Sequence, residues 1–112
     1  MYLSLNKLDG TIPESIGDLT TLTTLVLESS QISGTLPPLG NLKSLLHLNM
    51  RNNMISGTIP ESFGNLTSLL NLFLDNNQIN GTIPESFGNL TSLTTLTLIN
   101  NQINGTIPES IG

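Results

Sequence analysis

Short segments in which apolar and polar residues alternate recur along the chain at a nearly constant interval. Such alternation places every second side chain on one face of an extended strand, and here that face is apolar. A period of 20 to 50 residues is typical of a solenoid, in which each repeat packs only against its neighbours. The pattern therefore predicts a parallel sheet of stacked short strands. Their inward residues are Leu25 and Leu27, Leu48 and Met50, Leu72 and Leu74, and Leu96 and Leu98.

A short polar residue follows each strand. It is expected to bond the main-chain groups that are released where the strand ends. This residue is Asn53, Asn77 and Asn101 in three repeats and Ser30 in an earlier one. Because serine is shorter than asparagine, we expect a weaker junction at Ser30.

The second half of each repeat predicts another extended piece and then a turn of helix. In the clearest copy, Ile79 and Ile83 would point inward, and Asn80 and Thr82 outward. The Pro-Glu-Ser segment that follows favours a helical turn. Proline would take its first position, glutamate would lie in its first turn, and glycine would end it.

The glycines of the Gly-Thr pairs set the interval of the repeats. Their spacings are 24, 23, 24 and 24 residues, by subtraction along Gly10, Gly34, Gly57, Gly81 and Gly105. The short interval falls in 36–41, where one residue of the pattern is missing and Pro38 stands where other repeats have glutamate. We expect one domain over 1–112, without caps. It would hold a partial repeat at 1–18 and repeats at 19–41, 42–65, 66–89 and 90–112.

Written as a consensus, LxxLxxLxLxxNxIxGxIPxx(F/I)GN, the repeat resembles the plant-specific class of leucine-rich repeat. The mark of that class is the xGxIP segment after the asparagine. The resemblance covers essentially the whole chain. It implies an α/β-type, right-handed superhelical solenoid with a parallel concave β-sheet, a short second lateral sheet, and short helical or 3-10 turns on the convex side.

The resemblance also implies a function. The family includes receptor ectodomains, protease-inhibitor proteins and ice-binding proteins, so we expect a non-catalytic scaffold that binds a protein partner through its concave face. Family resemblance slightly favours the extracellular space or the secretory lumen, although the chain carries no signal peptide. The cysteine-containing caps that usually seal such arrays are absent from the sequence.

Charge and composition exclude several other classes. The net charge is −5, and Lys7, Lys43 and Arg51 are the only lysines and arginines, so no basic patch can neutralise phosphates. We therefore expect no nucleic-acid partner. No apolar run approaches the length of a membrane span. With His47 as the only histidine and no cysteine, we expect no enzyme, no metal site and no cofactor.

The outward strand positions form the candidate partner-binding face. Residues 66–88 and 90–112 are identical at 18 of 23 aligned positions, and four of the five differences fall on the short segment that carries this face. Inward positions must fill the same space in every repeat, whereas outward positions need not. Phe73 and Tyr2 are the expected anchors, because exposed aromatic side chains commonly carry interface energy. The expected face comprises Tyr2, Val26, Glu28, Leu46, His47, Asn49, Arg51, Leu70, Asn71, Phe73, Asp75, Thr97 and Ile99.

One outward column carries charges of alternating sign. Glu28, Arg51 and Asp75 occupy the same position on successive predicted strands. Opposite charges on neighbouring strands contribute roughly 0.2 to 1 kcal/mol. The column therefore predicts a lateral ladder of ion pairs.

Four asparagines fit the N-glycosylation sequon: Asn65, Asn80, Asn89 and Asn104. A repeat rich in asparagine and threonine generates such sequons by composition alone. Occupancy also requires a secretory route. Glycosylation of at least one of them remains an open alternative at this stage.

Two other functions stay open. Thr11, Thr35, Thr58, Thr82 and Thr106 predict an unbroken outward column, and a flat threonine ladder at strand spacing would suit ice or carbohydrate binding. Threonine also simply suits an exposed strand. In addition, the uncapped ends would each expose one side of an apolar layer. The chain could then be a structural subunit that makes contacts through its ends in a larger assembly.

Overall fold

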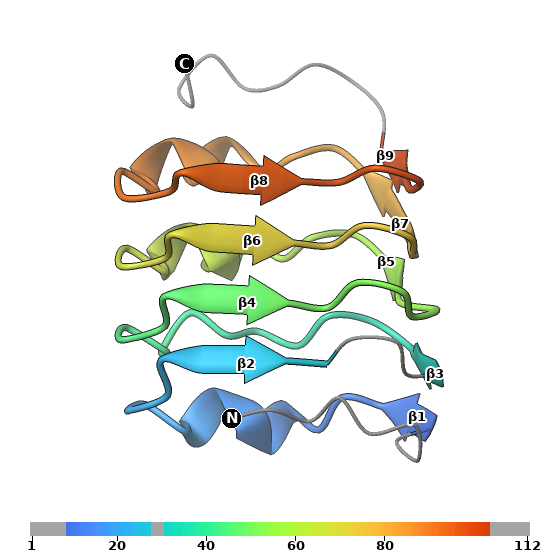
Figure 1. Ribbon diagram of the computed structural model, residues 1–112, viewed down its shortest axis with the longest axis horizontal. Helices are drawn as coiled ribbons and strands as arrows, with labels where there is room; N and C mark the ends of the chain where they lie inside the picture. The colour runs from blue at the N-terminus through green and yellow to red at the C-terminus, as the bar shows by residue number, and fades with distance from the viewer. Residues whose placement is uncertain (1–8, 28–30, 104–112) are drawn as a thin grey trace.

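Residues 9–27 and 31–103 are described by the computed structural model, which shows a right-handed solenoid (Figure 1). We call each turn of this solenoid a rung. Rungs 1 to 5 are residues 9–18, 19–41, 42–65, 66–89 and 90–103. The elements in chain order are β1 (Asp9–Thr11), η1 (Glu14–Asp18), β2 (Thr24–Val26), β3 (Gln31–Ser33), β4 (His47–Asn49), β5 (Ser56–Gly57), η2 (Glu61–Asn65), β6 (Asn71–Phe73), β7 (Gln78–Gly81), η3 (Glu85–Asn89), β8 (Thr95–Thr97) and β9 (Gln102–Ile103), where η marks a 3-10 helix.

The predicted parallel sheet is confirmed and contains strands β2, β4, β6 and β8 in that order. Equivalent residues lie directly opposite one another, with Leu25, Leu48, Leu72 and Leu96 paired across the four strands. The first three of these leucines are fully buried. Figure 1 shows the helical turns behind this sheet, so the core is a thin layer of leucine, isoleucine and phenylalanine between the two.

The asparagine after the strand bonds main-chain groups at the bend, as the sequence predicts, and it also joins two rungs. Asn77 Nδ2 donates to the carbonyl of Leu74 in its own rung at 3.1 Å and to that of Met50 in the rung before at 2.9 Å. Its Oδ1 accepts from the amide of Ile55 at 3.1 Å. Asn53 and Asn101 repeat this pattern. Ser30 lies outside the described residues.

A second row of asparagines runs along the surface beside the first. Asn52, Asn76 and Asn100 have φ between +60° and +61°, a left-handed conformation that asparagine tolerates better than most residues. Asn76 Nδ2 donates to Asn52 Oδ1 at 2.7 Å, and Asn100 Nδ2 to Asn76 Oδ1 at 2.6 Å. Sequence reasoning missed this row, although the Asn-Asn doublet marks it in three repeats.

The lateral strands β1 and β3, and β5, β7 and β9, pair in a shifted register. Gly10 lies opposite Ile32, two residues before its equivalent Gly34, and Thr11 lies opposite Ser33. Thr35 likewise bridges to Ser56. The expected straight ladder of threonines is therefore wrong, although Thr11, Thr35, Thr58 and Thr82 are all exposed. Thr106 lies outside the described residues.

The shifted register has a physical reason at the glycines. Gly57 has φ +79°, and the Cγ2 of Thr35 lies 2.8 Å from the place where a Cβ on Gly57 would be. The same contact joins Thr58 to Gly81. A threonine methyl group of one rung thus packs onto the bare glycine of the next rung. This packing sets threonine beside glycine instead of beside another threonine.

The three described Pro-Glu-Ser segments lead into 3-10 turns, but the ends of these turns differ from the prediction. Pro60 is the N-cap residue in an extended conformation, and its carbonyl accepts the first bond of the turn, from Phe63 N. Gly64 lies inside η2 instead of ending it. A Cβ at Gly64 would lie 2.5 Å from the Ser86 side chain, so this glycine is needed where successive turns touch.

Rung 2 has no helical turn, and Figure 1 shows a plain cyan tube where neighbouring rungs show coiled ribbons. The carbonyl of Pro38 lies 2.9 Å from the Cβ position of Gly17, as the carbonyl of Ser62 does at Gly40. Pro38 therefore takes the place of the serine, and the expectation that it replaces the glutamate is wrong. The residue that is missing from rung 2 would therefore lie before Pro38.

The missing residue of rung 2 removes a hydrogen-bond acceptor from Ser62 of rung 3. Ser86 Oγ of rung 4 donates to the carbonyl of Glu61 in the rung before at 2.7 Å. Ser62 is the equivalent serine of rung 3, but rung 2 has no residue in the place of Glu61. The hydroxyl of Ser62 is shielded from solvent and has no hydrogen-bond partner within the described part of the chain.

The buried asparagine row is expected to contribute more to stability than the surface row. Replacing Asn77 by alanine removes the partner of one amide and of three carbonyl groups, so we expect the free energy of unfolding to fall by about 3 kcal/mol. The control is Asn76→Gly, which keeps the positive φ and should cost less than about 1 kcal/mol. Urea unfolding monitored by circular dichroism measures both. Equal losses would contradict the assignment.

The two serines provide a second matched pair. Ser86→Ala removes a hydrogen bond and should lower the free energy of unfolding by about 1 kcal/mol. Ser62→Ala removes a hydroxyl that has no partner, so stability should stay the same or rise. The same urea titrations distinguish them. A Ser62→Ala loss as large as that of Ser86→Ala would show that Ser62 has an acceptor after all.

Candidate functional site

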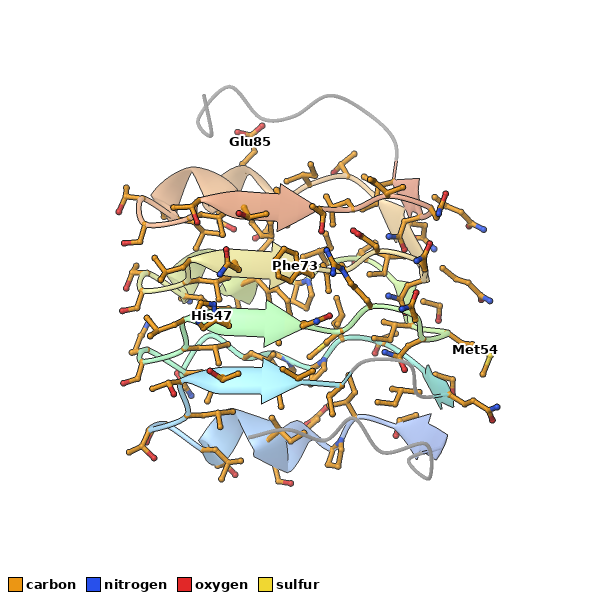
Figure 2. All side chains as sticks on the ribbon, in the orientation of Figure 1. His47, Met54, Phe73 and Glu85 are labelled. Carbon is orange, nitrogen blue, oxygen red and sulfur yellow. The ribbon has the colours of Figure 1, made fainter. Side chains whose placement is uncertain are left out.

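The outward columns of the four-stranded sheet lie in the predicted register. Val26, Asn49, Phe73 and Thr97 are paired in sequence across β2, β4, β6 and β8, and all four are half-buried. Figure 2 labels His47 and Phe73 over this sheet. Tyr2, the other expected anchor, lies outside the described residues. Whether this face binds a partner stays a prediction.

A second column on the same face runs through Thr24, His47, Asn71 and Thr95. His47 Nδ1 lies 2.6 Å from Asn71 Nδ2, and since an amide nitrogen only donates, the imidazole nitrogen accepts. Asn71 Oδ1 accepts in turn from the hydroxyl of Thr94 at 3.4 Å. His47 is thus a hydrogen-bonded surface residue that holds Asn71 in place.

Arg51, Phe73 and Asp75 form a compact cluster at the ends of the strands. The Arg51 guanidinium carbon lies 4.2 Å from the centre of the Phe73 ring, a cation–π contact between neighbouring rungs. Arg51 Nε lies 3.4 Å from Asp75 Oδ2, at ion-pair distance but without a well-aligned hydrogen bond. Asp75 Oδ1 accepts from the amide of Ile99 at 3.3 Å.

The predicted ion-pair ladder is therefore present between Arg51 and Asp75. Its other member, Glu28, lies outside the described residues. Sequence reasoning missed the stacking of Arg51 on Phe73, because the two residues belong to different outward columns and meet diagonally. The contact could have been expected from their positions. Arg51 lies one rung before Phe73 and two positions further along the strand direction, a diagonal separation that long side chains can span.

The remaining expected face residues that the structure describes lie at both ends of the strands. Leu46 and Leu70 precede strands β4 and β6 and are half-buried, and the amide of Leu70 donates to the carbonyl of Leu46 at 2.8 Å. Ile99 is 65% exposed. Asn49 Oδ1 accepts from the amide of Arg51 at 3.1 Å. The face therefore combines an aromatic ring, apolar side chains and oriented amides.

The expected sequons lie away from this face or outside the described chain. Asn65 and Asn89 end the turns η2 and η3, Asn80 lies in the lateral strand β7, and all three are exposed. Asn104 falls outside the described residues. Their glycosylation stays a prediction.

The described residues form neither a metal site nor a membrane-spanning helix. No group of three or more histidine, aspartate or glutamate side chains is placed to hold a metal ion in that part of the chain. None of the helices described there is long and apolar enough to span a membrane.

A double-mutant cycle tests the Arg51–Asp75 contact. The side chains are 33% and 14% exposed, so solvent screens the pair, and we expect a coupling energy of about 0.5 kcal/mol at low salt. The variants are Arg51→Gln and Asp75→Asn, and Asn keeps an oxygen for the amide of Ile99. Urea unfolding of all four proteins should give a coupling that falls towards zero near 1 M salt. A coupling independent of salt would contradict an ionic contact.

Several solved structures resemble this chain. One is the LRR ectodomain of the plant membrane receptor kinase GASSHO1/SCHENGEN3 from Arabidopsis thaliana, in complex with CASPARIAN STRIP INTEGRITY FACTOR 2. It is 40% identical with a TM-score of 0.89, over 92% of this chain and 12% of that one. The plant peptide hormone receptor RGFR1, in complex with RGF2, is 44% identical with a TM-score of 0.90, over 92% of this chain and 17% of that one.

A plant ice-binding protein is also similar, at 34% identity and a TM-score of 0.88, over 99% of this chain and 36% of that one. This chain thus spans only a small part of the two receptors and about a third of the ice-binding protein. No curated protein matches the sequence. The leucine-rich repeat model matches residues 44–66, 68–90 and 92–112, which is more than half of the sequence. The chain therefore belongs to the leucine-rich repeat family.

Proposed function

We propose that the chain is a non-catalytic protein-binding module and that a peptide or protein docks on its four-stranded face. The observation that carries this proposal is the cluster of Arg51, Phe73 and Asp75 at the strand ends. Arginine and aromatic side chains are enriched among the residues that dominate interface energies. Two of the similar structures are receptors in complex with a named partner, which supports a partner-binding role.

The cluster is suited to this role because it is ordered before any partner arrives. Phe73 is held by the guanidinium of Arg51, and Arg51 is oriented by Asp75. A side chain that is already fixed loses little conformational entropy on binding. The neighbouring pair His47 and Asn71 is fixed in the same way by a hydrogen bond.

The proposal extends to assignments of the whole chain. We assign the array to the plant-type subclass marked by xGxIP, which the plant origin of the similar receptors supports. We also propose an extracellular location, because the similar receptor region is an ectodomain. The array of 1–112 as one domain, contacts at its ends and glycosylation of at least one of Asn65, Asn80, Asn89 and Asn104 belong to the same proposal.

The test uses Phe73→Thr, because threonine stands at the equivalent position of the next rung, Thr97, and fits the sheet. Peptides are first selected from a displayed random library against the natural chain. Loss of a central aromatic anchor typically costs 2 kcal/mol or more, so the variant should bind these peptides about 30-fold more weakly. Titration calorimetry with each selected peptide measures the change.

The control is Glu61→Gln, on the turn η2 behind the sheet, which should leave the affinities unchanged. Urea unfolding of both variants shows whether the fold is kept. Selected peptides that bind Phe73→Thr as tightly as the natural chain, or no selected peptide at all, would refute the four-stranded face as the binding surface.

A second candidate is ice binding by the lateral side, which the similarity to a plant ice-binding protein favours. The exposed threonines supply hydroxyl and methyl groups there. The two-residue shift of register opposes it, because Thr11 and Thr35 stand opposite serines instead of forming a straight row. Thermal hysteresis of the purified chain distinguishes this candidate from the first.

A further inference from the structure

The missing residue of rung 2 opens two hollows on the side that carries the helical turns. The larger, of about 560 Å³, lies between rungs 1 and 2 and is walled by threonines and prolines such as Thr11, Thr35 and Pro37. The smaller, of about 320 Å³, reaches from η1 across rung 2 to Ser62 and Asn65 of rung 3. Glu14 and Pro38 line both. Such volumes are in the range of ligand pockets.

The absence of a turn explains why the space exists here. Turns η2 and η3 pack directly on one another, with a Cβ at Gly64 too close to Ser86 to be tolerated. Rung 2 instead passes between η1 and η2 through Pro37 and Pro38 as a segment without helix or strand. We call the two hollows together the rung-2 groove.

Within the described part of the chain, the charged residues that line the rung-2 groove are all negative. Glu14 and Asp18, both exposed on η1, line it, and none of the lysine, arginine or histidine residues described does. A described cation nearby is Lys43, whose Nζ donates to the carbonyl of Asn65 at 3.1 Å at the edge of the groove. Carboxylates in a partly enclosed hollow attract a cation more strongly than they do on an open surface.

Ser62, which lines the smaller hollow, carries an unpaired donor that is shielded from solvent. The hydroxyl of Ser62 has lost the carbonyl acceptor that its equivalent, Ser86, finds on Glu61. A carbonyl oxygen of a guest main chain, placed where rung 2 lacks a residue, would restore this hydrogen bond once the hydroxyl turns towards it. The groove therefore matches a guest with both a cation and a main-chain carbonyl.

We propose that the rung-2 groove is a second docking surface and that it binds a short, extended peptide segment rich in arginine or lysine. A basic side chain of the segment pairs with Glu14 and Asp18. A main-chain carbonyl accepts from Ser62. Pro13 and Pro38, the exposed prolines of the lining, pack against the apolar stems of the segment's side chains. This surface is on the opposite side from the four-stranded face and does not depend on the function proposed for that face.

The probe is an end-blocked hexapeptide of alternating arginine and glycine, labelled with fluorescein and followed by fluorescence anisotropy. The groove variant is Glu14→Gln with Asp18→Asn, and the control is Glu61→Gln with Glu85→Gln, on the turns η2 and η3. Each pair changes the net charge by two, from −5 to −3. Near 150 mM salt, distant charges are screened over about 8 Å. We expect the groove variant to lose affinity about tenfold or more and the control less than about twofold.

Two more variants separate docking in the groove from general attraction to an acidic protein. Replacing Pro37-Pro38 by Pro-Glu-Ser restores the missing residue and the helical turn. It should abolish binding although it adds a negative charge. Lys43→Gln should strengthen binding a few fold, because it removes a competing cation. Phe73→Thr should change nothing.

Several results would overturn the proposal. Equal losses in the groove and control variants would show binding to net charge alone. Tighter binding by the Pro-Glu-Ser variant would show the same. Weaker binding by Phe73→Thr would place the peptide on the four-stranded face, and no binding of the hexapeptide at millimolar concentration would leave the groove without its proposed guest.

Discussion

The structure depends on how each rung satisfies the main-chain groups at the end of its strand. Each strand of the main sheet is only three residues long, and the chain bends soon after it, at the buried residues Asn53 and Asn77 in two rungs. The side-chain amides of Asn53 and Asn77 supply the missing donors and acceptors, and they bond to the preceding rung as well as to their own. Buried polar groups without partners are costly, so this bend is possible only where a suitable side chain is present. The buried leucines then pack against a main chain whose bends are held in place by these hydrogen bonds.

The fold could be predicted closely because the period of the sequence fixes both the sheet and its inward residues. Leu48 and Leu72 must face the same layer in every rung, so equivalent residues must pair. No such requirement holds in the lateral strands, where Thr35 packs on Gly57 and the register shifts by two residues. This shift of register depends on side-chain contacts between neighbouring rungs. Aligning the sequences of successive repeats gives no information about these contacts.

The candidate face could be predicted in part for a related reason. The columns through Asn49 and Phe73 followed directly from the two-residue period of a strand. The stacking of Arg51 on Phe73 depends on side-chain rotamers across a diagonal, which no pattern along the chain specifies. The groove at rung 2 was visible only as a shorter interval. Its shape, and the unpaired hydroxyl of Ser62, became clear once Pro38 could be placed against Gly17.

The surface row of asparagines has a direction. Each amide nitrogen donates towards the start of the chain, from Asn100 to Asn76 and from Asn76 to Asn52. The dipoles of the three amides therefore add head to tail, and each bond polarises the next. Within the described residues, the row begins with the amide nitrogen of Asn52 and ends with the carbonyl oxygen of Asn100, so its two ends are chemically different. An array built in this way is polar along its axis even where its formal charges are few.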